Sequence, residues 1–487
     1  MTDLEQLAIR TLLASFPGAQ VPDWLRKRLG DGLGGVCLFG RNLTGHASIP
    51  ALIEDVHDAG PRALTTLDEE GGDVTRLYYR VGSPHAGHAV LGAADDLDLT
   101  QAVAHDIGIQ LRRAGADLDF APVADVNSNP RNPVIGVRSF GADPELVARH
   151  TVAWVRGLQD AGVGACLKHF PGHGDTMDDS HLALPVVDAS VEVLRRRELV
   201  PFRAGISAGA AAVMTSHVVV RGLDPGEPAT FSPAVLAVLR KPKSEGGLGF
   251  DGLLVSDALD MRGASAGIGI PAAAVRALAA GVDLLCLGGV LNDDEVQTVT
   301  DEIVGAVRAG QLSEGRLAEA ARRVDAAVDT LSTLRRNAGR PDSQRAETAG
   351  DSAARRALRV NGSFESLAGA QVLRFVTEPN QAVGHAPWGL PPDGLVLAGG
   401  TAHNVQEGEA LPDLDGRPVV ALVRGAQRYA WVQEALAALA ERRPDLVVVE
   451  LGWPGPDPLP GQGSVYTYGA SAASARAVDA LLANGSG

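Results

Sequence analysis

Short apolar runs alternate with amphipathic stretches over roughly the first 300 residues of the chain. The runs have the length of buried strands and cover 34–39, 63–67, 116–123, 165–170, 211–217, 252–257 and 282–287. The stretches between them predict helices near 99–114, 143–161, 188–208, 231–240, 270–280 and 293–309. One helix start is well marked, because Asp143 can cap the helix, Pro144 suits its first position and Glu145 faces its positive end.

This alternation predicts an α/β fold with a parallel sheet, and the number of runs suits a TIM-like (β/α)8 barrel. Polar side chains follow the ends of the predicted strands: Arg41 and Asn42, Asp68 to Glu70, Asp125, Lys168 and His169, His217 and Asp257. Barrel enzymes carry their active sites at this edge. An open, doubly wound sheet stays as the structural alternative, since periodicity does not distinguish the two.

A polar stretch without apolar period, at 336–352, follows a predicted helix at 312–335 and indicates a linker. Beyond it, apolar runs at 371–376, 394–400, 418–424 and 446–452 predict strands, with helices near 427–442 and 469–483. We therefore divide the chain into a catalytic barrel domain (1–335), a linker (336–352) and a smaller α/β sandwich domain (353–487). The first 18 residues, 1–18, indicate an amphipathic helix rather than a secretion signal, because charged residues interrupt their apolar positions.

The composition narrows the possible partners and surroundings. Of 487 residues, 45% are hydrophobic and 21% charged, a globular balance for which two domains are expected. A net charge of −16 argues against nucleic acid or an anionic membrane as a partner, and no apolar run is long enough to span a bilayer. Cys37, Cys166 and Cys286 lie in apolar runs and are expected to be buried thiols. We expect a cytoplasmic protein, either a monomer or a homodimer.

One segment, KHFPGHGDTMDDSHLALP at 168–185, carries an unusual concentration of titratable groups and turn residues. It is typical of a polar loop mounted on a strand. Asp179 precedes His181 by two residues, so its carboxylate can orient the imidazole for acid/base work. Asp257 ends an apolar strand and is a candidate nucleophile, although it could instead cap the helix that follows.

A metal site is the competing interpretation of the same loop. His169, His173, Asp175, Asp179 and His181 are residue types that bind zinc. However, no HExxH helix occurs, and no GK[ST] follows the GHG sequence to hold a phosphate. We therefore expect no metal and no cofactor.

Taken together, these motifs resemble glycoside hydrolase family 3, in its bacterial β-N-acetylglucosaminidase branch. The resemblance rests on LFGRN (38–42), the D-x-E-G-G-x-V-x-R pattern (68–76), DFAPVADV (119–126), GVRSFGADP (136–144), the long loop (168–185) and SDALDM (256–261). The terminal stretch VYTYGASAASARAVDALL (465–482) is similar to the family's second domain. That domain carries no cluster that we can connect to chemistry, so we expect a scaffold or a dimer surface.

The resemblance implies a retaining double displacement. Asp257 is the implied nucleophile, and His181, oriented by Asp179, is the implied acid/base. Matching positions imply that the sugar hydroxyls are held by Asp68, Arg76, Arg138, Lys168 and His169. Glu69 stands where the family often has glutamine, and we expect Glu69 and Glu70 to be solvated surface residues.

The leading hypothesis is an exo-acting β-N-acetylglucosaminidase for a small saccharide substrate, either muropeptides, as in peptidoglycan recycling, or chitooligosaccharides. A phosphorylase that uses the same residues is the nearest alternative. A metal-dependent barrel hydrolase and a noncatalytic sugar-binding protein are more distant ones.

Overall fold

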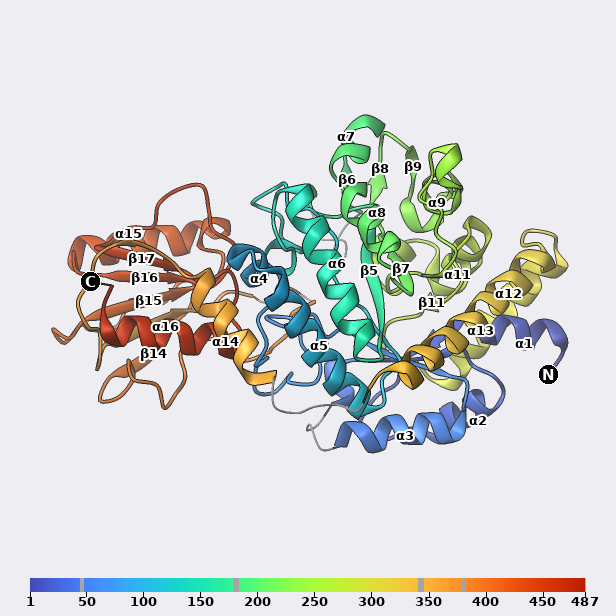
Figure 1. The fold of residues 1–487 in the computed structure, drawn as a ribbon, viewed down its shortest axis with the longest axis horizontal. Helices are drawn as coiled ribbons and strands as arrows, with labels where there is room; N and C mark the ends of the chain where they lie inside the picture. The colour runs from blue at the N-terminus through green and yellow to red at the C-terminus, as the bar shows by residue number, and fades with distance from the viewer. Residues whose placement is uncertain (44–47, 178–183, 340–345, 379, 381, 487) are drawn as a thin grey trace.

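The computed structural model describes residues 1–43, 48–177, 184–339, 346–378, 380 and 382–486. Figure 1 shows two parts: a large strand–helix part, coloured blue to yellow, and a second sheet with its own helices, coloured orange to red. The fold is therefore a TIM-like barrel followed by a smaller α/β domain, as the sequence predicts.

The barrel is an eight-stranded parallel sheet with the order β10-β7-β5-β4-β3-β2-β1-β11. Its strands are β1 (Leu12–Ala14), β2 (Gly35–Leu38), β3 (Leu64–Leu67), β4 (Leu118–Asp119), β5 (Gly164–Phe170), β7 (Ala212–Thr215), β10 (Leu253–Val255) and β11 (Leu285–Cys286). A parallel bridge between Val255 and Leu284 joins the two ends of the sheet. This bridge nearly closes the barrel and rules out the open, doubly wound alternative.

Helices surround the barrel and mostly follow the predicted ranges (Figure 1). They are α1 (Asp3–Arg10), α2 (Asp23–Gly30), α3 (Ile49–Ala59), α4 (His88–Ala94), α5 (Leu97–Ala114), α6 (Pro144–Asp160), α7 (Val191–Arg196), α8 (Leu199–Ser207), α9 (Pro233–Arg240), α10 (Arg262–Ser265), α11 (Gly269–Ala280), α12 (Asp293–Arg308) and α13 (Glu314–Asn337). The start of α6 is as expected, because the Asp143 side chain accepts a hydrogen bond from the Leu146 amide. The single helix predicted at 188–208 is instead divided into α7 and α8.

The N-terminal prediction was partly wrong. The stretch 1–18 does not form one amphipathic helix: α1 ends at Arg10, and Leu12–Ala14 form β1, which pairs with both β2 and β11. All three residues of β1 are buried. A strand that is buried on both faces shows no alternation of apolar and polar residues. The apolar residues of β1 therefore look like a continuation of the helical pattern before them.

The barrel interior explains the three cysteines. Cys37, Cys166 and Cys286 are free thiols buried in one apolar cluster that also contains Phe120 and Met214. They pack as small hydrophobic side chains, as the sequence predicts.

A small sheet accompanies the barrel, and a second large sheet follows it. The small sheet contains β6 (Val186–Val187), β8 (Val219–Val220) and β9 (Asp224–Pro228). The second sheet has the order β12-β17-β16-β15-β13-β14, in which only the β12–β17 pair is antiparallel. Its strands are β12 (Arg359–Gly362), β13 (Gln371–Phe375), β14 (Thr401–Val405), β15 (Val419–Val423), β16 (Val447–Glu450) and β17 (Gly463–Tyr466).

The second sheet is covered by helices on both faces. Val372 packs in an apolar cluster with residues of α16 (Ala472–Asn484), and its neighbour Leu373 packs in another with residues of α15 (Ala430–Arg442). Neighbouring residues of a strand point to opposite faces, so both faces are buried.

Two expectations for the second part need correction. The run 394–400, predicted as a strand, forms turns, and β14 begins only at Thr401. The predicted linker 336–352 contains the end of α13 and the start of α14 (Ala346–Ala357). In Figure 1, α14 lies between the barrel helices α4 and α5 and helix α16, and it contacts all three. The proposed domain boundaries themselves stay a prediction.

Among the described residues, every helix is too short or too polar to cross a lipid bilayer.

Candidate active site

A cavity of about 310 Å³ opens at the carboxyl ends of the barrel strands. Six of the residues predicted from sequence line it together: Asp68, Arg76, Arg138, Lys168, His169 and Asp257. They come from loops and strand ends more than 180 residues apart in the chain. The barrel topology brings them together, because parallel strands direct all their carboxyl ends to the same edge.

Asp257 follows β10 and is half-buried in the cavity wall, as predicted. Its Oδ1 accepts a hydrogen bond from the Ala258 amide at 2.8 Å. The Ala258 carbonyl lies 3.0 Å from Nε2 of His217, so a residue in the loop after β7 supports the backbone beside Asp257. Asp257 is not a helix N-cap, because Met261 is the N-cap of the next helix, α10.

Lys168 crosses the cavity floor from β5 and neutralises two carboxylates. Its Nζ lies 2.7 Å from Oδ1 of Asp68 and 2.6 Å from Oε1 of Glu70. Burial opposes charge on all three groups, but their mutual attraction outweighs it. The pKa values of Asp68 and Glu70 are therefore held below their ordinary range, and the pKa of Lys168 is raised. All three groups are charged at neutral pH.

Two arginines extend this network. Arg138 holds Glu70 through two hydrogen bonds, from Nε at 2.9 Å and from Nη2 at 2.7 Å. Its Nη2 also lies 3.3 Å from Nε2 of His169. Arg76 reaches Asp68 at 3.4 Å, while its buried Nε has no hydrogen-bond partner among the described residues. An unpaired buried donor costs free energy, so this Nε is suited to donate a hydrogen bond to an oxygen of a bound ligand.

The expectation that Glu69 and Glu70 are solvated surface residues was wrong. Both are buried. Glu70 is held by Lys168 and Arg138, as described above. Oε2 of Glu69 accepts hydrogen bonds from the Thr75 hydroxyl and from the amides of Arg76 and Leu77. Burial raises the pKa of Glu69 to about 7. Glu69 therefore shapes the loop that carries Arg76.

Asp125 orients the histidines of the cavity. Its Oδ2 lies 2.7 Å from Nδ1 of His169, and its Oδ1 accepts the amides of His169 and His173. Burial raises the pKa of Asp125, and the two histidines lower it. The net effect is a lowered pKa, which keeps Asp125 ionised. The sequence placed Asp125 at a strand end but gave no indication of this orienting contact.

The predicted loop at 168–185 is called the histidine loop here, and its base at Gly174 packs tightly against the barrel. A Cβ on Gly174 would lie 1.8 Å from the carbonyl oxygen of Val126, so only glycine fits there. Asp175, next in the chain, accepts a hydrogen bond from Ser128 at 2.9 Å and pairs with Arg197 at 2.6 Å. Asp179 and His181, the predicted dyad, lie outside the described residues, as does the neighbouring Asp178.

The second domain also reaches the cavity, which the sequence did not indicate. Ala382 lines the cavity, and its carbonyl accepts a hydrogen bond from Nη2 of Arg76 at 3.1 Å. The contact uses a backbone carbonyl of an alanine, so no chemical feature of the side chain could have predicted it. The second domain thus adds one wall to the site in addition to any scaffold role.

The alternative metal ligands are partly engaged in other contacts. Nδ1 of His169 faces Asp125, Nδ1 of His173 lies 2.8 Å from the Thr176 hydroxyl, and Asp175 is held as described. Within the described ranges, no group of three histidine, cysteine or acidic side chains is arranged to hold a metal ion. Asp179 and His181 would have to complete such a site.

Comparison with known proteins identifies the family. Residues 7–327 match the model of the glycosyl hydrolase family 3 N terminal domain. The chain belongs to glycosyl hydrolase family 3. It is a glycosidase, and its matched region contains every strand of the barrel.

Curated relatives match the barrel region of this chain, and a solved structure matches almost the whole chain. A β-hexosaminidase of Stenotrophomonas maltophilia is 37% identical over 332 residues, which are 65% of this chain and 96% of that protein. The β-hexosaminidase LpqI of Mycobacterium tuberculosis is 39% identical over 264 residues, 54% of this chain and 67% of that protein. The structure of a family 3 β-N-acetylglucosaminidase from Paenibacillus sp. FPU-7 superposes with a TM-score of 0.85 at 31% identity, covering 99% of this chain and 97% of that one.

Proposed function

We propose that this family 3 enzyme is a retaining exo-β-N-acetylglucosaminidase that removes terminal β-linked N-acetylglucosamine from muropeptides or chitooligosaccharides. One observation carries the proposal: Asp257 lines a cavity of about 310 Å³ with Asp68, Arg76, Arg138, Lys168 and His169. A cavity of this size suits one small ligand. The names of the similar β-hexosaminidases and of the Paenibacillus β-N-acetylglucosaminidase support the sugar.

The first chemical step assigns the nucleophile and the acid. An oxygen of the Asp257 carboxylate attacks the anomeric carbon, and the bond from that carbon to the leaving oxygen breaks. Protonated His181, held by Asp179, gives its proton to the leaving oxygen. The product is a glycosyl ester of Asp257 and a free alcohol.

The second step reverses the proton transfer. Neutral His181 takes a proton from water, whose oxygen attacks the anomeric carbon and displaces Asp257. Two inversions leave the sugar in its original β configuration. A cluster of fixed charges around the sugar hydroxyls supports both steps, because such groups need no reorganisation as charge develops.

We further propose that the enzyme has a cytoplasmic role in peptidoglycan recycling, as a monomer or a homodimer, without cofactor or metal.

Product analysis with phosphate varied tests the reaction type. Wild-type enzyme is incubated with an aryl β-N-acetylglucosaminide, and the sugar product is followed by proton NMR from the first seconds. We expect β-N-acetylglucosamine at every phosphate concentration. Accumulation of N-acetylglucosamine 1-phosphate would establish the phosphorylase instead, and initial release of the α-anomer would contradict the retaining mechanism.

A second experiment tests the metal-dependent alternative. Turnover that is lost in the presence of a chelator and restored by a divalent metal would establish a metal-dependent hydrolase.

A further inference from the structure

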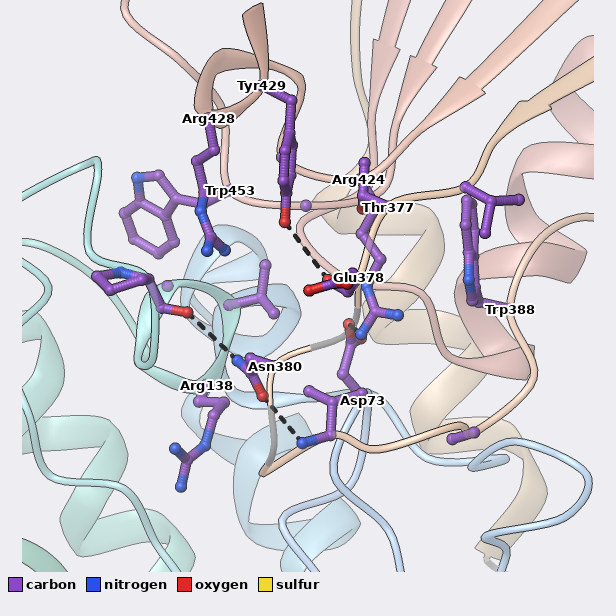
Figure 2. Close-up of a pocket in the computed structure, with 18 of the residues that line it drawn as sticks. Asp73, Arg138, Thr377, Glu378, Asn380, Trp388, Arg424, Arg428, Tyr429 and Trp453 are labelled. Carbon is purple, nitrogen blue, oxygen red and sulfur yellow. Dashed lines mark hydrogen bonds and ion pairs between the residues drawn. The ribbon is translucent and has the colours of Figure 1, made fainter. Parts of the chain in front are cut away.

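A second cavity, of about 300 Å³, lies between the barrel loops and the second domain (Figure 2). Its barrel side includes Asn132 and Arg138, and its other side comes from the turns after β13, β15 and β16. Arg138 lines both this cavity and the one that contains Asp257. The two cavities are therefore neighbours, with Arg138 at their boundary.

Aromatic side chains are concentrated in this cavity. The chain has five tryptophans, and two of them, Trp388 and Trp453, line the cavity together with Tyr429. Figure 2 shows Trp388 and Trp453 on opposite sides of it. The guanidinium groups of Arg374 and Arg424 lie over the Trp388 ring, at 5.4 and 5.9 Å from its centre. Trp453 is half-buried and has no such partner among the described residues. Its apolar surface is available to a ring of a ligand.

The arginines of the cavity have hydrogen-bond or ion-pair partners among the described residues, with one exception. Four arginines and two acids line it, in a chain whose net charge is −16. Arg138 is paired with Glu70, as described above, and Arg424 is paired with Asp73 at 2.6 Å. Arg374 donates to the Asn404 side chain at 2.9 Å and to the Trp388 carbonyl at 3.0 Å.

Arg428 is the exception. Within the part of the chain that the structure describes, its guanidinium has no acidic partner and lies only against the Tyr429 ring. Figure 2 shows it reaching into the cavity beside Trp453. The second lining acid, Glu378, is exposed, and its backbone carbonyl accepts the Tyr429 hydroxyl. A guanidinium presents paired donors that match a carboxylate, so Arg428 is suited to an anionic ligand.

Gln427, the residue before Arg428, supplies an unused acceptor. Its Nε2 donates to the carbonyl of Pro130 at 3.0 Å, which fixes the side-chain amide across the domain boundary. Its Oε1 is buried and has no partner among the described residues. Buried acceptors of this kind are usually satisfied, and a ligand hydroxyl would satisfy this one.

We propose that this cavity binds a saccharide that carries a carboxylate: the carboxylate pairs with Arg428, the ring packs on Trp453 and a hydroxyl donates to Oε1 of Gln427. Because Arg138 joins the two cavities, the bound saccharide is the leaving-group side of the substrate. This inference rests on the proposed function, and it goes beyond that function by assigning an acid-bearing leaving group to a site on the second domain.

The test compares two substrates that differ in one group. In both, N-acetylglucosamine is β-linked to a second sugar, which is glucuronate in one and glucose in the other. Values of kcat/KM are measured for the wild type, Arg428→Ala, Arg428→Lys and the control Arg442→Ala, whose exposed arginine lies at the end of α15 outside the cavity. An aryl β-N-acetylglucosaminide serves as the reference substrate for all four proteins.

We expect the wild type to prefer the glucuronate substrate by about five- to tenfold, the scale of one charged hydrogen bond at a partly exposed site. Arg428→Ala should reduce this preference to about one, and Arg428→Lys should retain part of it, because lysine keeps the charge but not the paired donors. Arg442→Ala should keep the full preference. Added salt should weaken the preference in the wild type.

The outcomes separate this inference from the proposed function. Normal turnover of the aryl substrate without a preference for glucuronate, or with a preference that persists in Arg428→Ala, overturns the inference alone. No turnover of the aryl substrate overturns the proposed function. Inhibition by free glucuronate that Arg428→Ala relieves, without a preference between the disaccharides, identifies a site for a free acid and contradicts the leaving-group assignment.

Discussion

The ammonium nitrogen of Lys168 lies 2.6 Å from Oε1 of Glu70, and each of the two side chains is only 1% exposed. The same carboxylate is held by Arg138, itself buried, so one acid pairs with two cations. Such a cluster is costly to disturb, because the loss of one member leaves uncompensated charge in a region of low dielectric constant.

Glu70→Gln should therefore destabilise the protein. We expect the free energy of unfolding to fall by about 3–5 kcal/mol, the usual cost of breaking a buried ion pair on one side. Thermal unfolding followed by calorimetry measures the change. Glu54→Gln, at an exposed position of α3, is the control and should leave the midpoint unchanged. Equal midpoints for the two variants would show that the cluster does not contribute to stability.

Asp257→Ala should abolish turnover of an aryl β-N-acetylglucosaminide. Loss of an enzyme nucleophile lowers kcat by roughly 10⁴-fold or more. Azide should restore activity to Asp257→Ala and give the α-glycosyl azide, because it enters from the side on which the carboxylate stood. Asp251→Ala is the control, since Asp251 is exposed just before β10, at the opposite end of the strand. Near-normal activity of Asp257→Ala without azide would remove Asp257 as the nucleophile.

Glu69 should make stability depend on pH. Burial raises the pKa of Glu69 to about 7 in the folded protein, from an ordinary value of 4.5. Between these values the folded state keeps a proton that the unfolded chain releases. The stabilising contribution is therefore complete below about pH 4.5 and is lost as the pH rises through about 7.

The side chain introduced by Glu69→Gln cannot ionise, so this variant should not lose stability as the pH rises. We expect similar unfolding midpoints for wild type and Glu69→Gln near pH 4.5, with the variant more stable by on the order of 3 kcal/mol at pH 8. Unfolding curves across this pH range, measured for both proteins, test the expectation. A constant difference between the two proteins at all pH values would contradict it. Glutamine is close to isosteric with the protonated glutamate.

Gly174→Ala should impair catalysis by displacing the base of the histidine loop. The added Cβ would lie 1.8 Å from the carbonyl oxygen of Val126, so the backbone must shift. A shift of this size near a catalytic group costs roughly 10²-fold in kcat/KM. Gly305→Ala is the matched control: the site lies in α12, and its added Cβ meets nothing within 4 Å. Equal kcat/KM values for the two variants would show that the loop base does not position a catalytic group.

The sequence predicted the barrel well because the alternation of apolar runs and amphipathic stretches is repeated many times along the chain. Seven of the eight strands follow the pattern of apolar runs, and only Leu12–Ala14 was missed. That strand is three residues long and directly follows a helix, so periodicity cannot separate the two. The opposite error occurred at 394–400, where an apolar run forms turns; Gly399 there has a φ of +75°, outside the conformation of a strand.

Within the site, the sequence located charged side chains but not their surroundings. Asp68 and Lys168 were predicted at the active edge of the barrel because they lie at the ends of predicted strands, and both line the cavity. Glu70 was expected on the surface, since nothing local shows that Arg138 and Lys168, about 70 and 100 residues away, compensate it. The contact of Ala382 was missed for the same reason. It joins Ala382 to Arg76 in the other domain, and it uses a main-chain carbonyl, so no side chain indicates it.

Asp73 connects a barrel loop to the second domain, so the charge balance beside the active site depends on residues beyond the barrel. Its carboxylate, 2% exposed, accepts the amide of Ala470 at 2.7 Å and pairs with Arg424, both beyond the barrel. The Stenotrophomonas relative is matched over 96% of its length by only 65% of this chain. If this chain were shortened to the barrel, Asp73 would lose both partners and Arg76 would lose the Ala382 carbonyl. In the shorter chain these groups would have to be satisfied by water or by other side chains.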